Sequence, residues 1–190
     1  MKINSLKDAL RAAAKESRKN LSKEDRQILN TLILGQFCKT FSCKGLKISI
    51  YLSMPDQLEI DTFPWIEKLE KDNEIFVPIT HFETLTMSHW KYNIGDSLML
   101  NRYGIPEPTK CQKSITPLHF DMVIVPLLAA DAQGNRLGYG KGFYDRFLIQ
   151  CREDVIKVGL NFFEPIEHIP TETTDIPLNF LVSPTRCYPF

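Results

Sequence analysis

The residues best suited to chemistry form a short glycine-rich loop in the second half of the chain. Gly138, Gly140 and Gly142 alternate with other residues, and Lys141 stands between the last two. A run of apolar residues precedes this loop, and a helix is expected directly after it, from Phe143. Backbone N–H groups in such a loop can point together at an anion, with the positive end of the helix behind them. The pattern therefore indicates phosphate binding.

The loop matches neither of the common phosphate-binding motifs. A P-loop has Ser or Thr after its Gly-Lys pair, where this chain has glycine. The motif G-x-G-x-x-G needs a third glycine where this chain has an aromatic residue, so a tight surface turn without a ligand is an alternative. Three cations around the loop, Arg136, Lys141 and Arg146, favour a polyanion such as a triphosphate. Asp145, at the start of the expected helix, is then a candidate Mg²⁺ ligand.

The segment from residue 126 to residue 145 resembles the nucleotide-binding signature of the 5-formyltetrahydrofolate cyclo-ligase family. That signature runs from a strand ending in Pro, through an Asp and a Gly, to R-L-G-x-G-x-G-x-Y-D. Ten fixed positions over twenty residues are far more specific than three glycines, and the resemblance extends from Lys7 to Asp175. The matching positions are Pro126, Asp131, Gly134, Arg136, Leu137, Gly138, Gly140, Gly142, Tyr144 and Asp145.

The resemblance implies an ATP site made by two segments. The family's K-x-x-L-R pattern near the N-terminus is met by Lys7 and Arg11, and the glycine loop supplies the rest. Lys141 and Arg136 are the implied catalytic residues. The implied ATP contacts are Lys7, Arg11, Arg136, Leu137, Gly138, Tyr139, Gly140, Lys141, Gly142, Phe143 and Tyr144.

The resemblance also implies a folate site and a Mg²⁺ site. Glu59 aligns with a family glutamate that binds the reduced pterin, and a carboxylate can accept two hydrogen bonds from its N–H groups. Mg²⁺ is implied at Asp145 and Asp175, although Asn179 stands where the family has a second acid. The implied substrate contacts are Leu52, Glu59, Tyr139, Gly140, Lys141, Gly142 and Phe143.

The implied reaction is the ATP- and Mg²⁺-dependent cyclisation of 5-formyltetrahydrofolate to 5,10-methenyltetrahydrofolate, with release of ADP and phosphate. Two alternatives stay open. One is a small-molecule kinase that uses the same anion loop. The other is a nucleic-acid or regulatory binding module built on a basic helical stripe, Lys7, Arg11, Lys15 and Arg18, whose usual role is a solvated face.

Helices alternate with strands along the chain, which predicts a single α/β domain over residues 1–190, a mainly parallel open sheet with helices on both faces. Ligands of such sheets bind at the carboxyl ends of the strands. Two helices are expected to open the chain, one capped by Ser5 with Leu6 on its apolar face, the other started by a capping box at Ser22. Further helices are expected over 63–69 and from 143, a loop over 101–108, and strands over 46–52, 75–77 (ending at Pro78), 85–92, 122–125, 155–160 and 180–182.

Composition points to a cytoplasmic protein that acts on small molecules. Lys plus Arg equals Asp plus Glu at 23 each, so no overall charge favours nucleic acid or a membrane. No apolar run approaches the roughly 20 residues that span a bilayer. The five cysteines show no C-x-x-C spacing and are typical of reduced thiols. A monomer is expected, with a dimer as the alternative.

Overall fold

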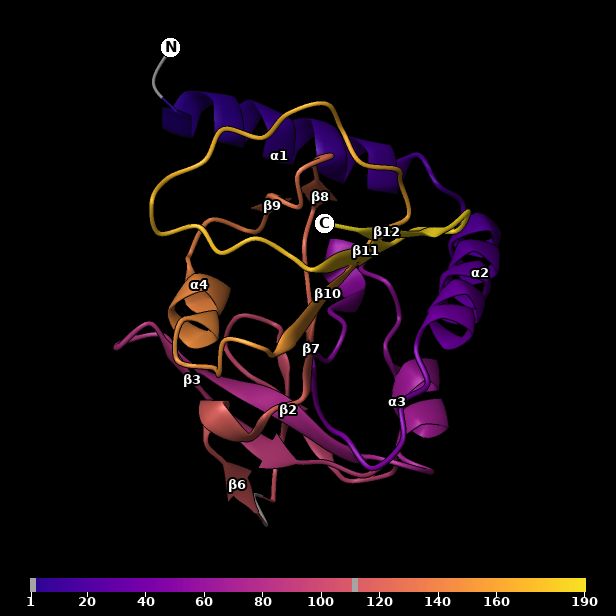
Figure 1. Ribbon diagram of the computed structural model, residues 1–190, viewed down its shortest axis with the longest axis vertical. Helices are drawn as coiled ribbons and strands as arrows, with labels where there is room; N and C mark the ends of the chain where they lie inside the picture. The colour runs from indigo at the N-terminus through magenta and orange to yellow at the C-terminus, as the bar shows by residue number, and fades with distance from the viewer. Residues whose placement is uncertain (1–2, 111–112) are drawn as a thin grey trace.

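An eight-stranded sheet organises the protein, as a computed structural model shows for residues 3–110 and 113–190 (Figure 1). Its strands follow the order β12-β11-β10-β7-β1-β2-β3-β6, and the five from β11 to β2 pair in parallel. The strands at both edges pair antiparallel. The expected mainly parallel α/β sheet is therefore confirmed. The bounds are β1 Lys47–Ile50, β2 Glu74–His81, β3 Thr86–Lys91, β6 Ser114–Ile115, β7 Met122–Val125, β10 Ile156–Leu160, β11 Phe180–Val182 and β12 Cys187–Pro189.

Four α-helices and two small antiparallel sheets complete the described part of the chain. No helix within residues 3–110 and 113–190 combines the length and the apolar character needed to cross a bilayer. The helices are α1 Ile3–Lys19, α2 Lys23–Thr40, α3 Phe63–Leu69 and α4 Phe143–Leu148, with short 3₁₀ turns η1 Pro55–Gln57 and η2 Pro117–His119. The small sheets pair β4 Leu98–Leu100 with β5 Pro106–Pro108, and β8 Ala129–Ala130 with β9 Arg136–Leu137.

The helices cover both faces of the large sheet, as expected. On one face α2 and α3 pack together, with the rings of Phe37 and Trp65 5.2 Å apart and both buried. On the other face Phe147 of α4 lies against Phe120, at 5.8 Å between ring centroids. The capping box of α2 is also confirmed, because the Ser22 hydroxyl accepts the Asp25 N–H at 2.9 Å.

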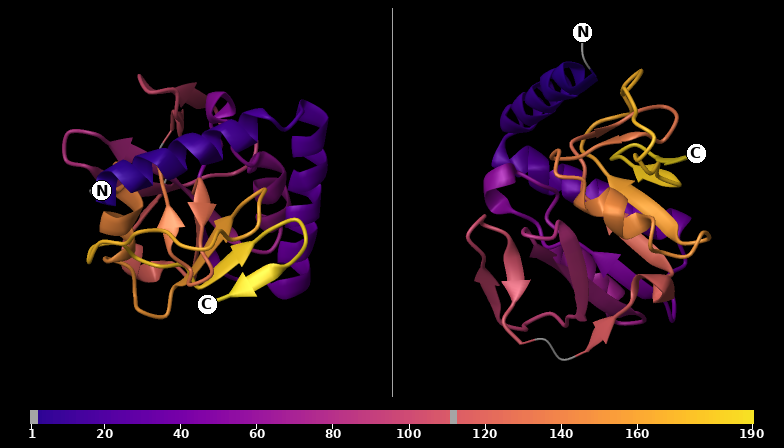
Figure 2. Two further views of the ribbon diagram at one scale, coloured as in Figure 1. Left: turned by 90° about the horizontal axis from the view of Figure 1, so that it is seen from above. Right: turned by 90° about the vertical axis from the view of Figure 1, so that its left-hand side faces the viewer.

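Helix α1 crosses the end of the sheet where the parallel strands finish (Figures 1 and 2). It turns its basic stripe inward: Lys7 and Arg18 are buried, whereas Leu6 is 38% exposed. The expected apolar face was therefore wrong for Leu6, because the cations find acids and a carbonyl beneath the helix. The expected Ser5 cap was also wrong, since the helix already includes Ile3 and Ser5 lies within it.

Strand β2 runs past the point where the sequence predicts its end. It continues through Pro78 to His81, paired only with β3 beyond Phe76. Strand β1 does not pair with β2 at Pro78. The absence of an N–H at Pro78 therefore costs no hydrogen bond between these two strands. The expected loop over 101–108 likewise contains a short strand, β5.

Candidate active site

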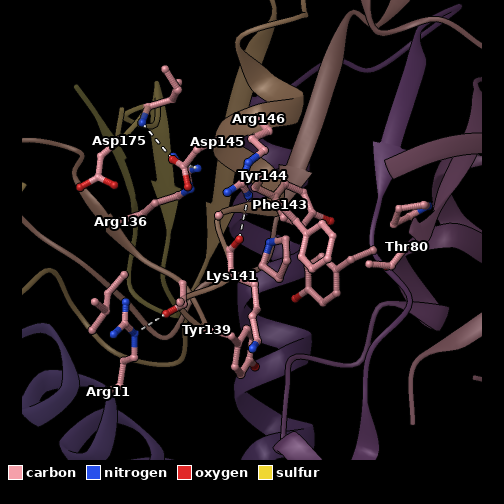
Figure 3. A pocket seen from close by; sticks show the side chains of 18 of the residues that line it. Arg11, Thr80, Arg136, Tyr139, Lys141, Phe143, Tyr144, Asp145, Arg146 and Asp175 are labelled. Carbon is pink, nitrogen blue, oxygen red and sulfur yellow. Dashed lines mark hydrogen bonds and ion pairs between the residues drawn. The ribbon is translucent and has the colours of Figure 1, made fainter. Parts of the chain in front are cut away.

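One cavity of about 780 Å³ opens beneath α1, at the carboxyl ends of the central strands. In Figure 3, Arg136, Asp145 and Asp175 gather on one side of it and Thr80 lies on the opposite side. Every residue that the sequence predicts for the site lines this cavity. They are Lys7, Arg11, Leu52, Glu59, Arg136, Leu137, Gly138, Tyr139, Gly140, Lys141, Gly142, Phe143, Tyr144, Asp145 and Asp175.

The glycine loop uses backbone shapes that suit glycine. Gly140 and Gly142 have φ values of 92° and 68°, in the left-handed region that side chains disfavour. The loop is held from α1 by Arg11, whose Nε donates to the Gly138 carbonyl at 3.0 Å. Helix α4 has only six residues, so its dipole is short. Anion binding here would depend mainly on the loop amides and the surrounding cations.

Three cation–carboxylate contacts, made by two cations, lie at one end of the cavity. Lys7 Nζ is 2.7 Å from Asp175 Oδ2 and 3.2 Å from Glu172 Oε2. Burial lowers the pKa of Lys7, but the hydrogen bonds and charges of these two acids outweigh it and the net pKa is raised. Arg136 Nη2 is 2.6 Å from Asp145 Oδ1, while its buried Nη1 has no partner among the described residues. Unpaired buried donors of this kind suit an incoming anion.

Glu59 lies at the other end, at the loop after β1. Its Oε1 accepts the Tyr139 hydroxyl at 2.6 Å and its Oε2 accepts the Met54 N–H at 2.7 Å. Burial raises the pKa of Glu59, opposed by these two hydrogen bonds and by the charge of Arg18. Thr62 fixes the loop, because its hydroxyl donates to the Tyr51 carbonyl at 2.7 Å. The result is a half-buried, oriented carboxylate facing the cavity.

The two ends of the cavity are matched to different chemical groups. Lys7 and Arg18 stand eleven residues apart on α1, which is roughly 16 Å along a helix. Lys7 marks the cationic end, and Arg18 contacts Tyr139, the partner of Glu59. The cavity can therefore take an elongated pair of ligands, with a polyanion at one end and N–H donors at the other.

Comparison with known proteins shows to which family the chain belongs. The family model for the 5-formyltetrahydrofolate cyclo-ligase family matches residues 3–184. The chain belongs to this family. The resemblance found in the sequence, and with it the expectation of a cyclo-ligase enzyme, is confirmed.

Relatives from bacteria carry the same family name. The 5-formyltetrahydrofolate cyclo-ligase of Escherichia coli K12 is 34% identical over 146 residues, which cover 74% of this chain and 79% of the relative. That of Haemophilus influenzae is 35% identical over 136 residues, covering 69% and 72%. The solved structure of Aquifex aeolicus 5,10-methenyltetrahydrofolate synthetase aligns with a TM-score of 0.79 and 29% identity, over 97% of this chain and 92% of that one.

The two acids predicted to hold Mg²⁺ in this cyclo-ligase keep free oxygens. Asp145 Oδ1 accepts Arg136 and the Ile176 N–H, and Asp175 Oδ2 accepts Lys7 and the Glu172 N–H. Their other oxygens, Asp145 Oδ2 and Asp175 Oδ1, accept no hydrogen bond from any described residue. Hard carboxylate oxygens fit Mg²⁺.

Mg²⁺ would need ligands from outside the protein as well. No cluster of three or more His, Cys, Asp and Glu side chains suited to a metal occurs in residues 3–110 and 113–190. Asn179, at the family's second acidic position, is engaged elsewhere, because its Oδ1 accepts the Lys157 N–H at 2.9 Å. The donor set therefore suits a cation that arrives bound to a polyphosphate and water rather than an all-protein metal site.

Several residues of the cavity escaped the sequence analysis. Phe82 and Tyr103 stack at 3.7 Å between centroids, and Phe143 meets Phe82 edge-on at 5.2 Å. Phe143 was predicted, but Phe82 and Tyr103 come from two other segments, and no local pattern brings the three rings together. Glu172 was also missed, and its only signal is a position three residues before Asp175.

Most of the basic stripe of α1 is turned toward the protein, although Lys15 is exposed. Lys7, Arg11 and Lys15 all line the cavity, and Lys15 Nζ lies 5.7 Å from the centre of the Tyr139 ring. Arg18 is 3% exposed. A stripe turned into the protein cannot present a basic surface to nucleic acid, so this feature gives no support to a nucleic-acid-binding module.

Proposed function

We propose that this cyclo-ligase converts 5-formyltetrahydrofolate to 5,10-methenyltetrahydrofolate, using Mg²⁺ and ATP and releasing ADP and phosphate. The observation that carries the proposal is a single cavity with shielded cations at one end and a half-buried carboxylate at the other. The cations suit a triphosphate, and the carboxylate suits the N–H groups of a reduced pterin. Family membership supports the same reaction.

The chemistry requires activation of a poor electrophile. An N-formyl group is an amide, and its oxygen does not leave unaided. Transfer of the γ-phosphoryl group of ATP to that oxygen gives ADP and an iminium phosphate. The N10 amine then attacks the activated carbon, loses its proton, and expels inorganic phosphate as the ring closes. Atoms and charge balance without an oxidant or reductant.

Most of the protein's contribution in this reaction is positioning and charge neutralisation. Lys7, Arg11, Arg136 and the amides of residues 138–144 would bind the nucleotide, with Lys141 and Arg136 stabilising the transferring phosphoryl group. Glu59 and Leu52 would bind the pterin, together with the loop from Tyr139 to Phe143. Both groups of residues meet in this loop, which suits a transfer between the two ligands.

Asp145 and Asp175 would hold the magnesium ion through the oxygens that accept no hydrogen bond within the described part of the chain. When bound, Mg²⁺ neutralises phosphate oxygens and polarises the phosphoryl group. In this protein the two acids are neutralised by Arg136 and Lys7. If a nucleotide and its cation bind together, the phosphates would pair with Arg136 and Lys7 and the cation would pair with Asp145 and Asp175. The local charge would then stay balanced.

We also propose that the enzyme acts as a monomer in the cytoplasm. Every residue given a role above comes from one chain, and together they line one cavity. This single-chain set of residues is the basis for proposing a monomer.

The direct test is to mix the protein with Mg-ATP and 5-formyltetrahydrofolate. We expect methenyl product absorbance to rise in step with inorganic phosphate, in a one-to-one ratio with ATP consumed. A stable phosphorylated product without ring closure would instead indicate a small-molecule kinase. Salt-dependent RNA binding with no ATP turnover would indicate a binding module.

Gly140→Ala should weaken ATP binding. A Cβ there would lie 3.1 Å from the Arg11 guanidinium carbon, at a φ of 92°. The strain of about 1–2 kcal/mol for a side chain in this region, with displacement of Arg11, should raise the KM for ATP about tenfold. Steady-state kinetics with varied ATP measure this. Gly35→Ala is the control, because a Cβ at Gly35 meets nothing within 4 Å; equal KM values for the two variants would contradict the prediction.

A further inference from the structure

A chain of hydrogen bonds joins helix α1 to Glu59. Arg18 Nη1 donates to the Tyr139 hydroxyl at 3.1 Å, and that hydroxyl donates to Glu59 Oε1 at 2.6 Å. Arg18 Nη2 donates to the Leu127 carbonyl, directly after β7, which anchors the guanidinium. The three side chains come from α1, the glycine loop and the loop after β1, so these hydrogen bonds connect three segments that lie far apart in the sequence.

The direction of this chain is fixed by its first member. Arginine has only donors, so Tyr139 must accept from Arg18 with an oxygen lone pair. A tyrosine hydroxyl has a single proton. Because the hydroxyl oxygen accepts from Arg18, its proton can be donated to Glu59. Arg18 therefore favours the arrangement in which the Tyr139 proton points to Glu59 Oε1 and the carboxylate acts as an acceptor.

Packing alone gives a poor explanation for a buried arginine at this position. Arg18 is 3% exposed, and its Nε is buried without a partner among the described residues. An apolar side chain of similar size would fill the space without the cost of burying an unpaired donor. The arrangement is better explained by the groups that Arg18 contacts.

We propose that Arg18 is a positioning residue which, through the Tyr139 hydroxyl, holds Glu59 as the charged acceptor for the N–H groups of the pterin. The inference rests on the proposed function, since it concerns how the substrate is bound. It adds a third residue to the basic stripe that serves the reaction: Lys7 and Arg11 act at the nucleotide end, and Arg18 acts at the pterin end.

The hydrogen-bonded chain from Arg18 through Tyr139 to Glu59 is called the relay below. The charges around Glu59 determine how the relay would respond to pH. The groups that face it are the Arg18 guanidinium, the phenols of Tyr51, Tyr139 and Tyr144, and the Met54 amide. Burial raises the pKa of Glu59, while Tyr139, Met54 and Arg18 lower it. Loss of Arg18 or of the Tyr139 hydroxyl therefore raises that pKa further, and the carboxylate takes up a proton at higher pH.

The test compares Arg18→Met, Tyr139→Phe and the double variant between pH 6 and pH 8. Each single change should raise the KM for 5-formyltetrahydrofolate about tenfold at neutral pH, as expected for loss of a hydrogen bond to a charged group. The rise should grow as the pH falls, whereas in Arg18→Met the KM for ATP and kcat stay within about twofold. Because both residues act through one chain, the double variant should be no worse than either single variant. Arg18→Lys should recover part of the loss.

Lys19→Met is the matched control, since Lys19 is the next residue on α1 and its side chain is 67% exposed. A rise in the KM for ATP equal to that for the folate would overturn the proposal, because it would mean that Arg18 simply holds α1 in place. Multiplicative effects in the double variant would also overturn it.

Failure of the relay can be told apart from failure of the proposed function. If the unmodified protein makes no methenyl product, the proposed function fails. A carboxyl-¹³C NMR titration of Glu59 in the free protein, assigned with Glu59→Gln, still tests the relay. The Glu59 titration should move to higher pH in Arg18→Met and in Tyr139→Phe. An unchanged titration would show that neither residue controls this carboxylate.

Discussion

Replacing Lys141 with alanine is expected to lower kcat about 100- to 1,000-fold while leaving the free energy of unfolding nearly unchanged. Lys141 is exposed, lines the cavity, and its ammonium group has no hydrogen bond or ion pair with any described residue. It therefore contributes little to the fold. Its charge is available for the phosphoryl group, and the loss should fall on the transition state, where charge develops on that group.

The measurement is the rate of methenyl formation at saturating ATP and folate, with unfolding in urea as the stability check. Lys141→Arg should keep part of the rate, because a guanidinium carries the charge on a different geometry. Lys39→Ala, at an exposed lysine near the end of α2, is the control. Turnover of Lys141→Ala equal to that of the control would remove Lys141 from the mechanism.

The ten-position signature combines residues of two kinds, and only the structure separates them. Asp131 is fully buried, and its carboxylate accepts the N–H groups of Gln133, Asn135 and Ile169. It holds the β8–β9 hairpin and the segment before Asp175. Gly134 forms the turn of the same hairpin at a φ of 83°. Neither contacts the cavity. The signature therefore contains residues that line the cavity and also residues, such as Asp131 and Gly134, that hold the surrounding backbone in place.

Local patterns in the sequence were sufficient for most of the helices and strands, whereas most of the residues predicted for the site came from the family resemblance. The capping box at Ser22 and the strand over 180–182 each depend on neighbouring residues, and the structure bears them out. The end of β2 could not be read in this way, because the tolerance for Pro78 depends on where its neighbour β1 stops. Partners far apart in the chain, such as Arg18 with Tyr139, were likewise beyond local reading.

The inward turn of α1 illustrates the same limit. Its sequence presents a basic stripe and an apolar stripe, and hydrophobicity favours burial of the apolar one. In the structure Lys7 of the basic stripe is buried instead, because Glu172 and Asp175 lie beneath it. A charged side chain can be buried when acids elsewhere in the fold pair with it. The sequence of the helix alone does not show that such acids are present.

A second large effect is expected on stability, through His89. This residue is 2% exposed on β3, stacks on Phe147 at 4.2 Å between centroids, and its Nε2 has no partner among the described residues. Burial lowers its pKa from 6.5 to about 3, because a charged imidazole loses solvation in this apolar surrounding. The folded protein therefore holds His89 neutral at pH values where the unfolded chain binds a proton.

The sign follows from this difference. Above pH 6.5 both states leave His89 neutral, and the full stability is present; as the pH falls from 6.5 toward 3, protonation favours the unfolded chain. The cost grows by about 1.4 kcal/mol per pH unit, or about 2 kcal/mol between pH 8 and pH 5. Urea unfolding at several pH values, followed by the fluorescence of buried Trp65, measures it. His89→Phe should flatten the dependence whatever its effect at pH 8, while His168→Gln, at an exposed histidine, should keep it. The same slope in both variants would mean that other groups, and not the packing of His89 against α4, cause the acid sensitivity.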